Sequence, residues 1–464
     1  MVAASYTLAA AVGSLTVMAV GNVFGRRYCI IIGNVCAIIG PALQASTWSV
    51  SQIIVGRVIG VSIRPLSMSS KKCATDSSQG FGLGFISCTV PTYMAEMSIN
   101  PKQRGPEIAI QCAVLISGIA LAYWVAFGFT RMDNQLSWRF PIGLQAIFAI
   151  ISLLGMLMLP DTPRWYYSTG RDEQGDNVLS RLHALPLNHP KVQAQKEEIQ
   201  ASIRLETQEV TKFDLSLLVW DTSELRVGRR IRIAFLILSL KQMMGINMMV
   251  YYSTLIFSQV GLSSFLSQLL AAVMMTIYAF GTYVLPSTIE RFGRRTILLT
   301  TAIACTVFML IFVVMIAVPN RTLVTQWTGV AAVILFMCSF GYGWIGIPWL
   351  YASEIAPLNY RHVGGAAGAF GEWVFSFVTV FGGGYAIASV GWRIWIWQIF
   401  SCALAIAFVY FMCPETSGKT LEEIDIVFAT DAVKERAVAA LAERTYHESK
   451  TQTGAQAYYQ DNAA

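Results

Sequence analysis

The sequence predicts an all-α membrane protein built from two related halves. Hydrophobic residues make up 55% of the 464 residues and charged residues only 13%, whereas soluble domains average about 25% charged residues. Apolar runs recur along the chain, and a run of about 20 residues is long enough to cross a bilayer. Several short motifs occur twice, once in each half. Together these observations indicate a polytopic helical protein with an internal repeat.

Three pairs of motifs define this repeat. They occur in the same order in both halves, which favours a duplicated unit over two unrelated basic loops. The pairs are Gly25–Arg27 with Glu290–Arg295, Pro91–Glu96 with Pro348–Glu354, and Pro160–Thr162 with Pro414–Thr416.

Eleven apolar segments are expected to span the membrane. They are residues 3–21, 28–47, 51–97 (interrupted), 107–129, 139–159, 232–258, 268–288, 296–318, 327–351, 362–388 and 394–413. An odd number is unexpected for a duplicated protein, so one span seen in the second half is missing from the front of the first. The spans divide the chain into an N-terminal bundle (1–159), a linker with short helices (160–231), a C-terminal bundle (232–413) and a tail (414–464).

Basic residues in the short loops predict the orientation. One set of loops carries Arg26, Arg27, Lys102, Arg104, Arg291, Arg294, Arg295 and Arg361, and the opposite set carries Arg131, Arg139, Arg321 and Arg393. The richer set is expected in the cytoplasm, together with the linker and the C-terminus. The protein is therefore predicted to be a multi-pass protein of the plasma membrane.

A polar segment, residues 61–79, interrupts the third apolar region. It contains Arg64, Lys71, Lys72 and Asp76, and such a segment cannot face lipid. Its removal joins the flanking glycine-rich stretches into one continuous span. Two explanations stay open, a retained intron in the gene model and a genuine loop insertion.

At these motifs the chain resembles the sugar porter branch of the major facilitator superfamily, and its fungal members most closely. The resemblance extends from residue 5 to about residue 428. The residues that carry it are Gly56-Arg57 with Gly80, Gly82 and Gly84; Glu96–Pro101 with Arg104 and Gly105; Pro160–Arg164; Gln242–Tyr252; Pro348–Glu354; and Pro414–Glu422. It implies the major facilitator fold, in which two pseudo-symmetric six-helix bundles surround a central site. About 11 of the usual 12 helices are expected here, because the family's first helix is absent from this sequence.

Charged residues at the cytoplasmic helix ends are expected to form gating salt bridges. Arg26 and Arg27 would face Glu96, and Arg294 and Arg295 would face Glu354. Interfacial ion pairs of this kind contribute about 0–1 kcal/mol each, which suits a contact that must open. A purely topological role for the charges is the alternative. The full set of gating candidates is Arg26, Arg27, Glu96, Arg104, Asp161, Arg164, Glu290, Arg294, Arg295, Glu354, Arg361 and Glu415.

The resemblance also implies a substrate site near the bilayer midplane. Its candidate residues are Gln111, Cys112, Lys241, Gln242, Asn247, Tyr251, Tyr278, Trp349 and Glu372. Four positions depart from the amide residues of the family, namely Cys112, Lys241, Tyr278 and Glu372. Trp349 remains as a stacking surface for a sugar ring.

Lys241 and Glu372 introduce opposite charges into this site. They lie 9 and 10 residues from the cytoplasmic helix ends near Arg232 and His362, which at about 1.5 Å per residue is roughly 14–15 Å deep in the bilayer. An unpaired ion there costs at least about 2.5–3.5 kcal/mol. We therefore expect Lys241 and Glu372 to pair; the alternative is that each reaches water in the cavity.

The predicted function is secondary transport of a sugar, or of a related polyol or sugar acid, by alternating access. Proton coupling stays open, with Arg57 and Glu372 as candidates. A nutrient sensor that does not transport and an inactive truncated transporter are the alternatives. No catalytic constellation, nucleotide-binding loop or metal-ligand pattern is visible in the sequence. We therefore expect no enzyme activity, no cofactor or metal and no nucleic-acid partner, and a monomer whose partners are the solute, lipid and, where coupled, protons.

Overall fold

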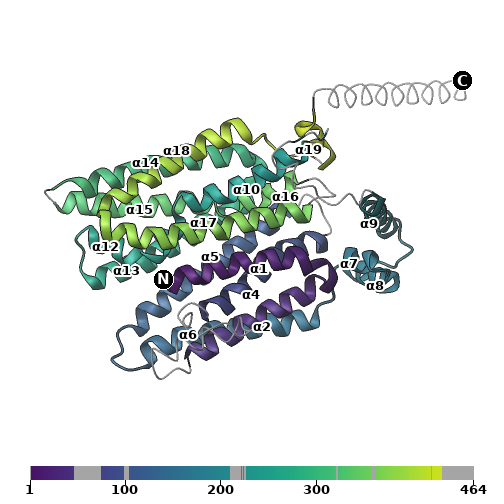
Figure 1. The fold of residues 1–464 in the computed structure, drawn as a ribbon, viewed down its shortest axis with the longest axis horizontal. Coiled ribbons are helices and arrows are strands. Elements are labelled where there is room, and N and C mark those ends of the chain that lie inside the picture. The colour runs from purple at the N-terminus through teal and green to yellow at the C-terminus, as the bar shows by residue number, and fades with distance from the viewer. Residues whose placement is uncertain are drawn as a thin grey trace, which may run out of the picture.

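Two helical bundles lie side by side in the computed structural model (Figure 1). The structure describes residues 2–45, 75–98, 104–208, 221, 223, 226–319, 322–356, 361–419 and 421–430. The N-terminal bundle contains α1 (Val2–Phe24), α2 (Arg26–Ala45), α4 (Thr75–Met97), α5 (Arg104–Phe129) and α6 (Leu136–Met158). The C-terminal bundle contains α10 (Val227–Met243), α11 (Ile246–Tyr251), α12 (Ser253–Gln259), α13 (Ser264–Phe292), α14 (Arg294–Ala317), α15 (Leu323–Gly343), α16 (Ile347–Ile355), α17 (Arg361–Val390) and α18 (Ile394–Met412).

Seven stretches of the described chain are long and apolar enough to cross a membrane. One of them, Val363–Met412, contains nearly all of α17 and the whole of α18, and a shorter apolar stretch, Tyr6–Val17, lies within α1. Every regular element in the described residues is a helix. The prediction of an all-α membrane protein is therefore confirmed.

Glycines let α4 pack closely between α1 and α2. A Cβ atom on Gly84 would overlap the carbonyl oxygen of Ala10 in α1 and would lie 2.9 Å from Gly13 Cα. On the opposite side of α4, a Cβ on Gly82 would lie only 2.6 Å from the carbonyl oxygen of Gly33 in α2. Small residues at such contacts allow two membrane helices to approach backbone to backbone.

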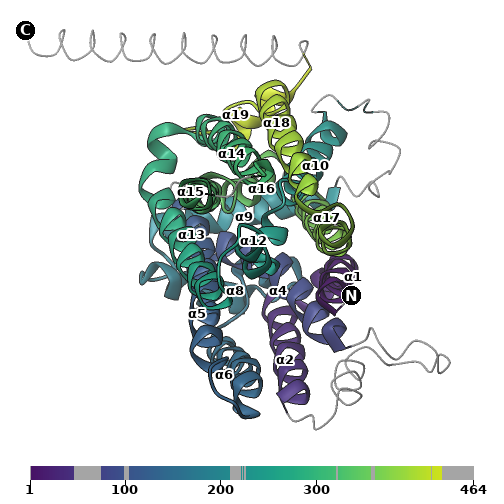
Figure 2. The same ribbon diagram turned by 90° about the vertical axis from the view of Figure 1, so that its left-hand side faces the viewer.

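The bundles meet mainly through two helix pairs, α1 with α17 and α5 with α13. Figure 2 shows both pairs nearly end-on, with α5 beside α13 and α1 beside α17. Polar side chains cross the α5–α13 contact, since Trp124 Nε1 donates to Thr276 Oγ1 at 2.9 Å and Ser117 Oγ donates to Tyr283 OH at 3.1 Å. Helix α5 also contributes apolar side chains to the large core of the C-terminal bundle.

Two spans of the C-terminal bundle are broken near their middle. The first breaks between α10 and α11 at Gly245, whose φ of +81° is a left-handed conformation that favours glycine. The carbonyl oxygen of Met244, freed by this break, accepts a hydrogen bond from Gln398 Nε2 at 2.8 Å. The second breaks between α15 and α16, just before Pro348. Breaks of this kind place irregular backbone inside the protein, where it can line a central site.

The linker forms short helices at one end of the bundles, α7 (Pro163–Ser168), α8 (Asp172–His183) and α9 (Pro190–Gln208). Helix α19 (Leu421–Phe428), in the chain after the last span, lies at the same end (Figure 1). Lys196 and Asp176 tie α9 to α8 through an ion pair of 2.7 Å. Of these helices, α7 contacts α4 and α19 contacts α16, which are two of the helices that carry the repeated motifs.

The polar segment 61–79 is described only in part. Residues 61–74 lie outside the described residues, whereas Thr75–Gln79 form the first turn of α4. Gln79 Nε2 donates to Gln145 Oε1 of α6 at 2.7 Å. The last five residues of the polar segment therefore belong to α4, the same helix whose glycines pack against α1.

Candidate functional site: two charged clusters and a central ion pair

The repeated motifs of the N-terminal bundle meet at one end of the molecule, which we call the arginine end because it carries Arg26 and Arg294. Arg26 Nη2 lies 2.9 Å from Glu96 Oε1, as the sequence predicts. The hydroxyl of Thr162 donates to the other oxygen of Glu96 at 2.6 Å. Asp161 accepts backbone N–H groups from Arg27 at 3.1 Å and Thr162 at 2.8 Å. The three motifs of this half therefore form one hydrogen-bonded cluster.

The C-terminal bundle repeats this cluster almost atom for atom. Arg294 Nη2 lies 3.0 Å from Glu354 Oε1, and the hydroxyl of Thr416 donates to Glu354 Oε2 at 2.8 Å. Glu415 accepts the backbone N–H of Arg294 at 2.8 Å, at the first turn of α14. A carboxylate is favourable there because it accepts N–H groups that have no partner within the helix. The C-terminal cluster has one more acidic partner than the N-terminal cluster described above. Arg294 also binds Glu290 through both terminal nitrogens, at 2.9 and 2.8 Å.

The second arginine of each basic turn has a different partner from the one the sequence predicts. Arg27 donates its guanidinium to the carbonyl oxygens of Met156 and Leu157, at 3.2 and 2.7 Å, instead of facing Glu96. Arg295 likewise donates to the carbonyl oxygen of Tyr410 at 2.7 Å instead of to Glu354. Both side chains thereby satisfy carbonyls near the C-terminus of a helix, where a positive charge is also favourable.

Each charged cluster lies within a single bundle. Arg26 and Glu96 belong to α2 and α4, whereas Arg294 and Glu354 belong to α14 and α16. A contact between the bundles at this end involves Gly105 of α5, on which a Cβ atom would lie 2.8 Å from Glu290 Oε1 and 3.2 Å from Arg294 Nη2. The N-terminal bundle therefore abuts the charged cluster of the other bundle through a residue without a side chain.

For three of the gating candidates, Arg104, Arg361 and Arg164, we describe no side-chain contact with the two clusters. The side chains of Arg104 and Arg361 lie outside the described residues, although their backbones begin α5 and α17. Arg164 is the second residue of α7 and lies two residues after Thr162, whose hydroxyl binds Glu96. A gating role for any residue of the two clusters stays a prediction.

Asp161 gives this end a testable pH dependence. It lies in the loop after α6, and burial raises the pKa of its carboxyl above 3.8, although N–H donors from Thr162 and Arg27 and the charge of Arg26 oppose the shift. A raised pKa means that the folded state holds the proton more tightly than the unfolded state. This stabilisation is complete below the unfolded pKa and is lost as the pH rises through the folded pKa. The measurement is the difference between two melting temperatures, that of the wild type minus that of Asp161→Asn. We expect this difference to fall as the pH rises from below about 4. A difference that grows with pH would show instead that the attraction of Arg26 dominates.

Lys241 and Glu372 form the centre of the candidate substrate site. Lys241 Nζ lies 2.6 Å from Glu372 Oε1, and the two residues are only 2% and 5% exposed. Gln242 Nε2 donates to the same carboxylate oxygen at 2.6 Å. Lys241 Nζ also lies 5.5 Å from the centre of the Trp349 ring, within the range of a cation–π contact. The ion pair that the sequence predicts is present; its part in substrate binding stays a prediction.

The remaining substrate candidates lie on three helices, α5, α11 and α13. Asn247 Nδ2 donates to Ser376 Oγ at 2.5 Å, which links α11 to α17. Tyr278 on α13 is buried, and Tyr251 at the end of α11 is 42% exposed. Cys112 on α5 is partly buried, and its Cβ would lie 3.9 Å from a Cβ on Gly346. The neighbouring Gln111 has a buried Oε1 that finds no hydrogen-bond partner in the described part of the chain. Arg57, the other coupling candidate, lies outside the described residues.

Some residues of these sites could not have been chosen from the sequence. Ser376 binds Asn247, and Trp373 Nε1 donates to Ser87 Oγ of the N-terminal bundle at 3.1 Å. Nothing in a uniformly apolar span marks either serine. Thr162 and Thr416 did carry a signal, because both belong to the repeated proline–acid–threonine motif.

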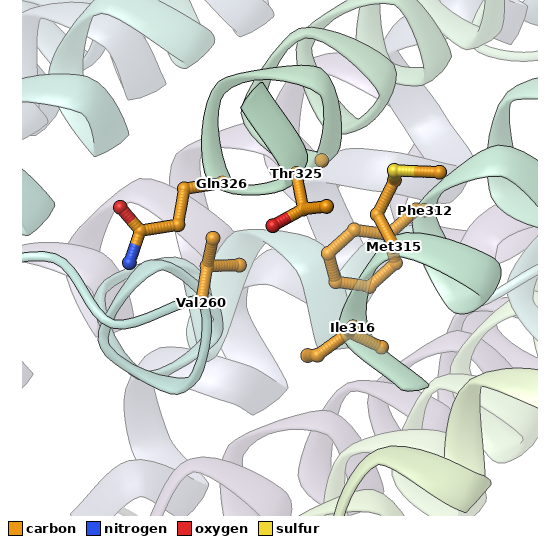
Figure 3. Close-up of a pocket in the computed structure, with 7 residues that line it drawn as sticks. Val260, Phe312, Met315, Ile316, Thr325 and Gln326 are labelled. Atoms are coloured by element: carbon orange, nitrogen blue, oxygen red, sulfur yellow. The ribbon is translucent and has the colours of Figure 1, made fainter. Parts of the chain in front are cut away.

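A small cavity lies elsewhere in the C-terminal bundle (Figure 3). It has a volume of about 10 Å³ and is lined by Val260, Phe312, Met315, Ile316, Thr325, Gln326 and Gly329. A space of this size holds about one water molecule at most. It takes no part in the central site, which none of these residues lines.

Comparison with known proteins points to one family. The family model described as "Sugar (and other) transporter" matches residues 1–63 and 73–428, leaving residues 64–72 of the polar segment unmatched. The chain is 30% identical over 429 residues to the MFS-type transporter oryC of Aspergillus oryzae, covering 91% of this chain and 76% of that protein. It is 29% identical to the sugar transporter STL1 of Saccharomyces cerevisiae, covering 91% of this chain and 71% of that protein.

Solved structures show the same fold. The proton:xylose symporter XylE bound to 6-bromo-6-deoxy-D-glucose matches with a TM-score of 0.75 at 21% identity, covering 92% of this chain and 88% of that one. The inward open conformation of XylE from E. coli matches with a TM-score of 0.68 at 21% identity, covering 91% of this chain and 88% of that one. The major facilitator fold expected from the sequence is thereby confirmed.

Proposed function

Because the chain belongs to the sugar (and other) transporter family, we propose that it carries a sugar, a related polyol or a sugar acid across a membrane by alternating access. The observation that supports this most directly is the buried polar centre. Lys241, Gln242 and Glu372 meet beside the break between α10 and α11, and Trp349 presents its ring to them from α16. A site built from broken helices near the middle of a bundle is typical of secondary transporters.

The arginine end is proposed to be the cytoplasmic gate. The repeated clusters hold the helix ends of each bundle together, so each bundle can move as a unit. Opening would separate Gly105 from Glu290 and Arg294, which belong to the other bundle. The relatives support transport in general terms, because both are named as transporters.

The test is solute exchange in liposomes that contain the purified full-length protein. We expect uptake of at least one labelled sugar, polyol or sugar acid from a panel that includes xylose, glucose, glycerol, sorbitol and gluconate. Replacing Trp349 with alanine removes the stacking surface, which is worth about 1–1.5 kcal/mol, so exchange at low solute concentration should fall about tenfold. Binding of a solute without exchange would favour the sensor alternative, and neither binding nor exchange would favour an inactive protein.

A further inference from the structure

The central ion pair leaves two buried acceptors unused. Glu372 Oε1 receives hydrogen bonds from both Lys241 and Gln242, at 2.6 Å each. The second oxygen, Glu372 Oε2, is buried and has no hydrogen-bond partner among the residues that the structure describes, and the same is true of Gln242 Oε1. A buried carboxylate oxygen without a donor is unfavourable, and each such atom calls for an explanation. A proton on Glu372 Oε2 would turn this unsatisfied acceptor into a donor.

Protonation of Glu372 has a consequence for Lys241. The neutral acid no longer balances the ammonium group, which is only 2% exposed. A buried, unpaired cation at this depth is costly, so the site then favours an anion beside Lys241. Conversely, an anion that enters while Glu372 is ionised would leave the site with a net negative charge. The proton and the anion each make the binding of the other more favourable.

We propose that Lys241 and Glu372 make this site selective for a polyhydroxylated carboxylate that is carried together with one proton. In the empty state the site holds a lysine cation and a glutamate anion, and is neutral. In the loaded state it holds the lysine cation, the solute carboxylate and a protonated glutamate, and is again neutral. On release, Glu372 returns its proton to water and pairs with Lys241 once more. This inference rests on the proposed transport function and specifies its substrate class.

The surroundings of the pair are consistent with this charge balance. Cys112 of α5 and Tyr278 of α13 both interact electrostatically with Glu372. Both are uncharged in their protonated forms. Helix α1, which packs along α17, contains no Asp, Glu, Lys, Arg or His. Within the described residues the balance of charge in the site is therefore set by Lys241 and Glu372.

The deciding experiment compares gluconate with glucose in proteoliposomes that contain the full-length protein and a trapped pH indicator. For the wild type we expect gluconate uptake to acidify the lumen by one proton per solute. Gluconate accumulation should also rise when the outside is made acidic. Glucose exchange, where present, should move no proton. Glucose carried with a proton, or gluconate carried without one, would overturn the proposal.

Two substitutions separate the roles of the pair. Lys241→Gln should lower gluconate uptake at least about tenfold, whereas Lys241→Arg, which keeps the charge, should retain most of it. Glu372→Gln should keep gluconate exchange between equal solutions but abolish proton movement and accumulation driven by a pH gradient. Lys196→Gln, which breaks the ion pair between α8 and α9, is the matched control and should match the wild type. Gluconate uptake that survives Lys241→Gln would contradict the role of Lys241, and proton movement that survives Glu372→Gln would contradict that of Glu372.

The same experiment distinguishes failure of this inference from failure of the proposed transport function. Transport of glucose or sorbitol without any transport of gluconate would overturn the inference and leave the transport function standing. Such a result would mean that hydroxyl groups of a neutral solute donate to Glu372 Oε2 and Gln242 Oε1. A protein that carries none of the solutes, although its monodispersity in detergent shows that it is folded, would count against both.

Discussion

Replacing Arg294 with alanine is expected to lower the free energy of unfolding by about 3 kcal/mol, roughly twice the effect of the same change at Arg26. The side chain of Arg294 is 6% exposed and binds two carboxylates, Glu290 and Glu354. Its removal leaves both acids close together without a cation. We place the loss at the lower end of the range for buried ion pairs because the Glu290 side chain is 42% exposed, and water can therefore solvate it.

Arg26→Ala is the matched comparison because the repeat supplies the same surroundings with one acid fewer. Asn22 occupies the position that corresponds to Glu290 in the other half. Glu96 and Glu354 each keep a threonine hydroxyl donor after the change, from Thr162 and Thr416, so this contact does not distinguish the two variants. The measurement is thermal unfolding of both variants in the same detergent, with Arg294→Lys as a third variant. A lysine cannot bind two carboxylates in the planar arrangement of a guanidinium, so it should restore only part of the stability. Equal losses at Arg26 and Arg294 would show that Glu290 adds nothing.

Replacing Gly84 with alanine should destabilise the N-terminal bundle by about 2–3 kcal/mol, because the new methyl group meets backbone that cannot rotate away. The atoms it would strike are the carbonyl oxygen of Ala10 and the Cα of Gly13. Relief requires α1 and α4 to move apart along their whole contact. The same substitution at Gly118 in α5 is the control, since a Cβ atom there meets nothing within 4 Å.

Gly118→Ala should be neutral or should stabilise the protein by up to about 1 kcal/mol, because alanine favours a helix over glycine. The two variants therefore differ in sign as well as in size. Thermal unfolding and the yield of monodisperse protein measure the difference. If both variants behave alike, close backbone packing between α1 and α4 is not what fixes this bundle.

The sequence predicts contacts correctly where charge and the internal repeat limit which residues can pair. The three motif pairs predict the contacts of Arg26 with Glu96 and of Arg294 with Glu354, because two related halves must fold in the same way. The depth argument predicts the contact between Lys241 and Glu372, since an isolated charge at the centre of a bilayer is costly. These contacts measure 2.9, 3.0 and 2.6 Å.

Other features could not be predicted because they depend on backbone geometry. Asp161 and Glu415 bind backbone N–H groups at helix starts, and the choice between such donors and a nearby guanidinium is decided only in three dimensions. In α4, Gly80 and Gly84 face α1 whereas Gly82 faces α2. A span that is apolar on all sides gives no periodic signal of which neighbour each face meets.

The confinement of each ionic cluster to one bundle has a consequence for how the protein responds to salt. In the proposed alternating-access motion, Arg26 would keep Glu96, and Arg294 would keep Glu290 and Glu354, because each pair lies within one bundle. No counter-ion would then have to be recruited from solution when the proposed gate at the arginine end opens. Added electrolyte screens exposed charges but weakens buried pairs much less. The turnover rate for a neutral solute should therefore stay nearly constant over a wide range of ionic strength.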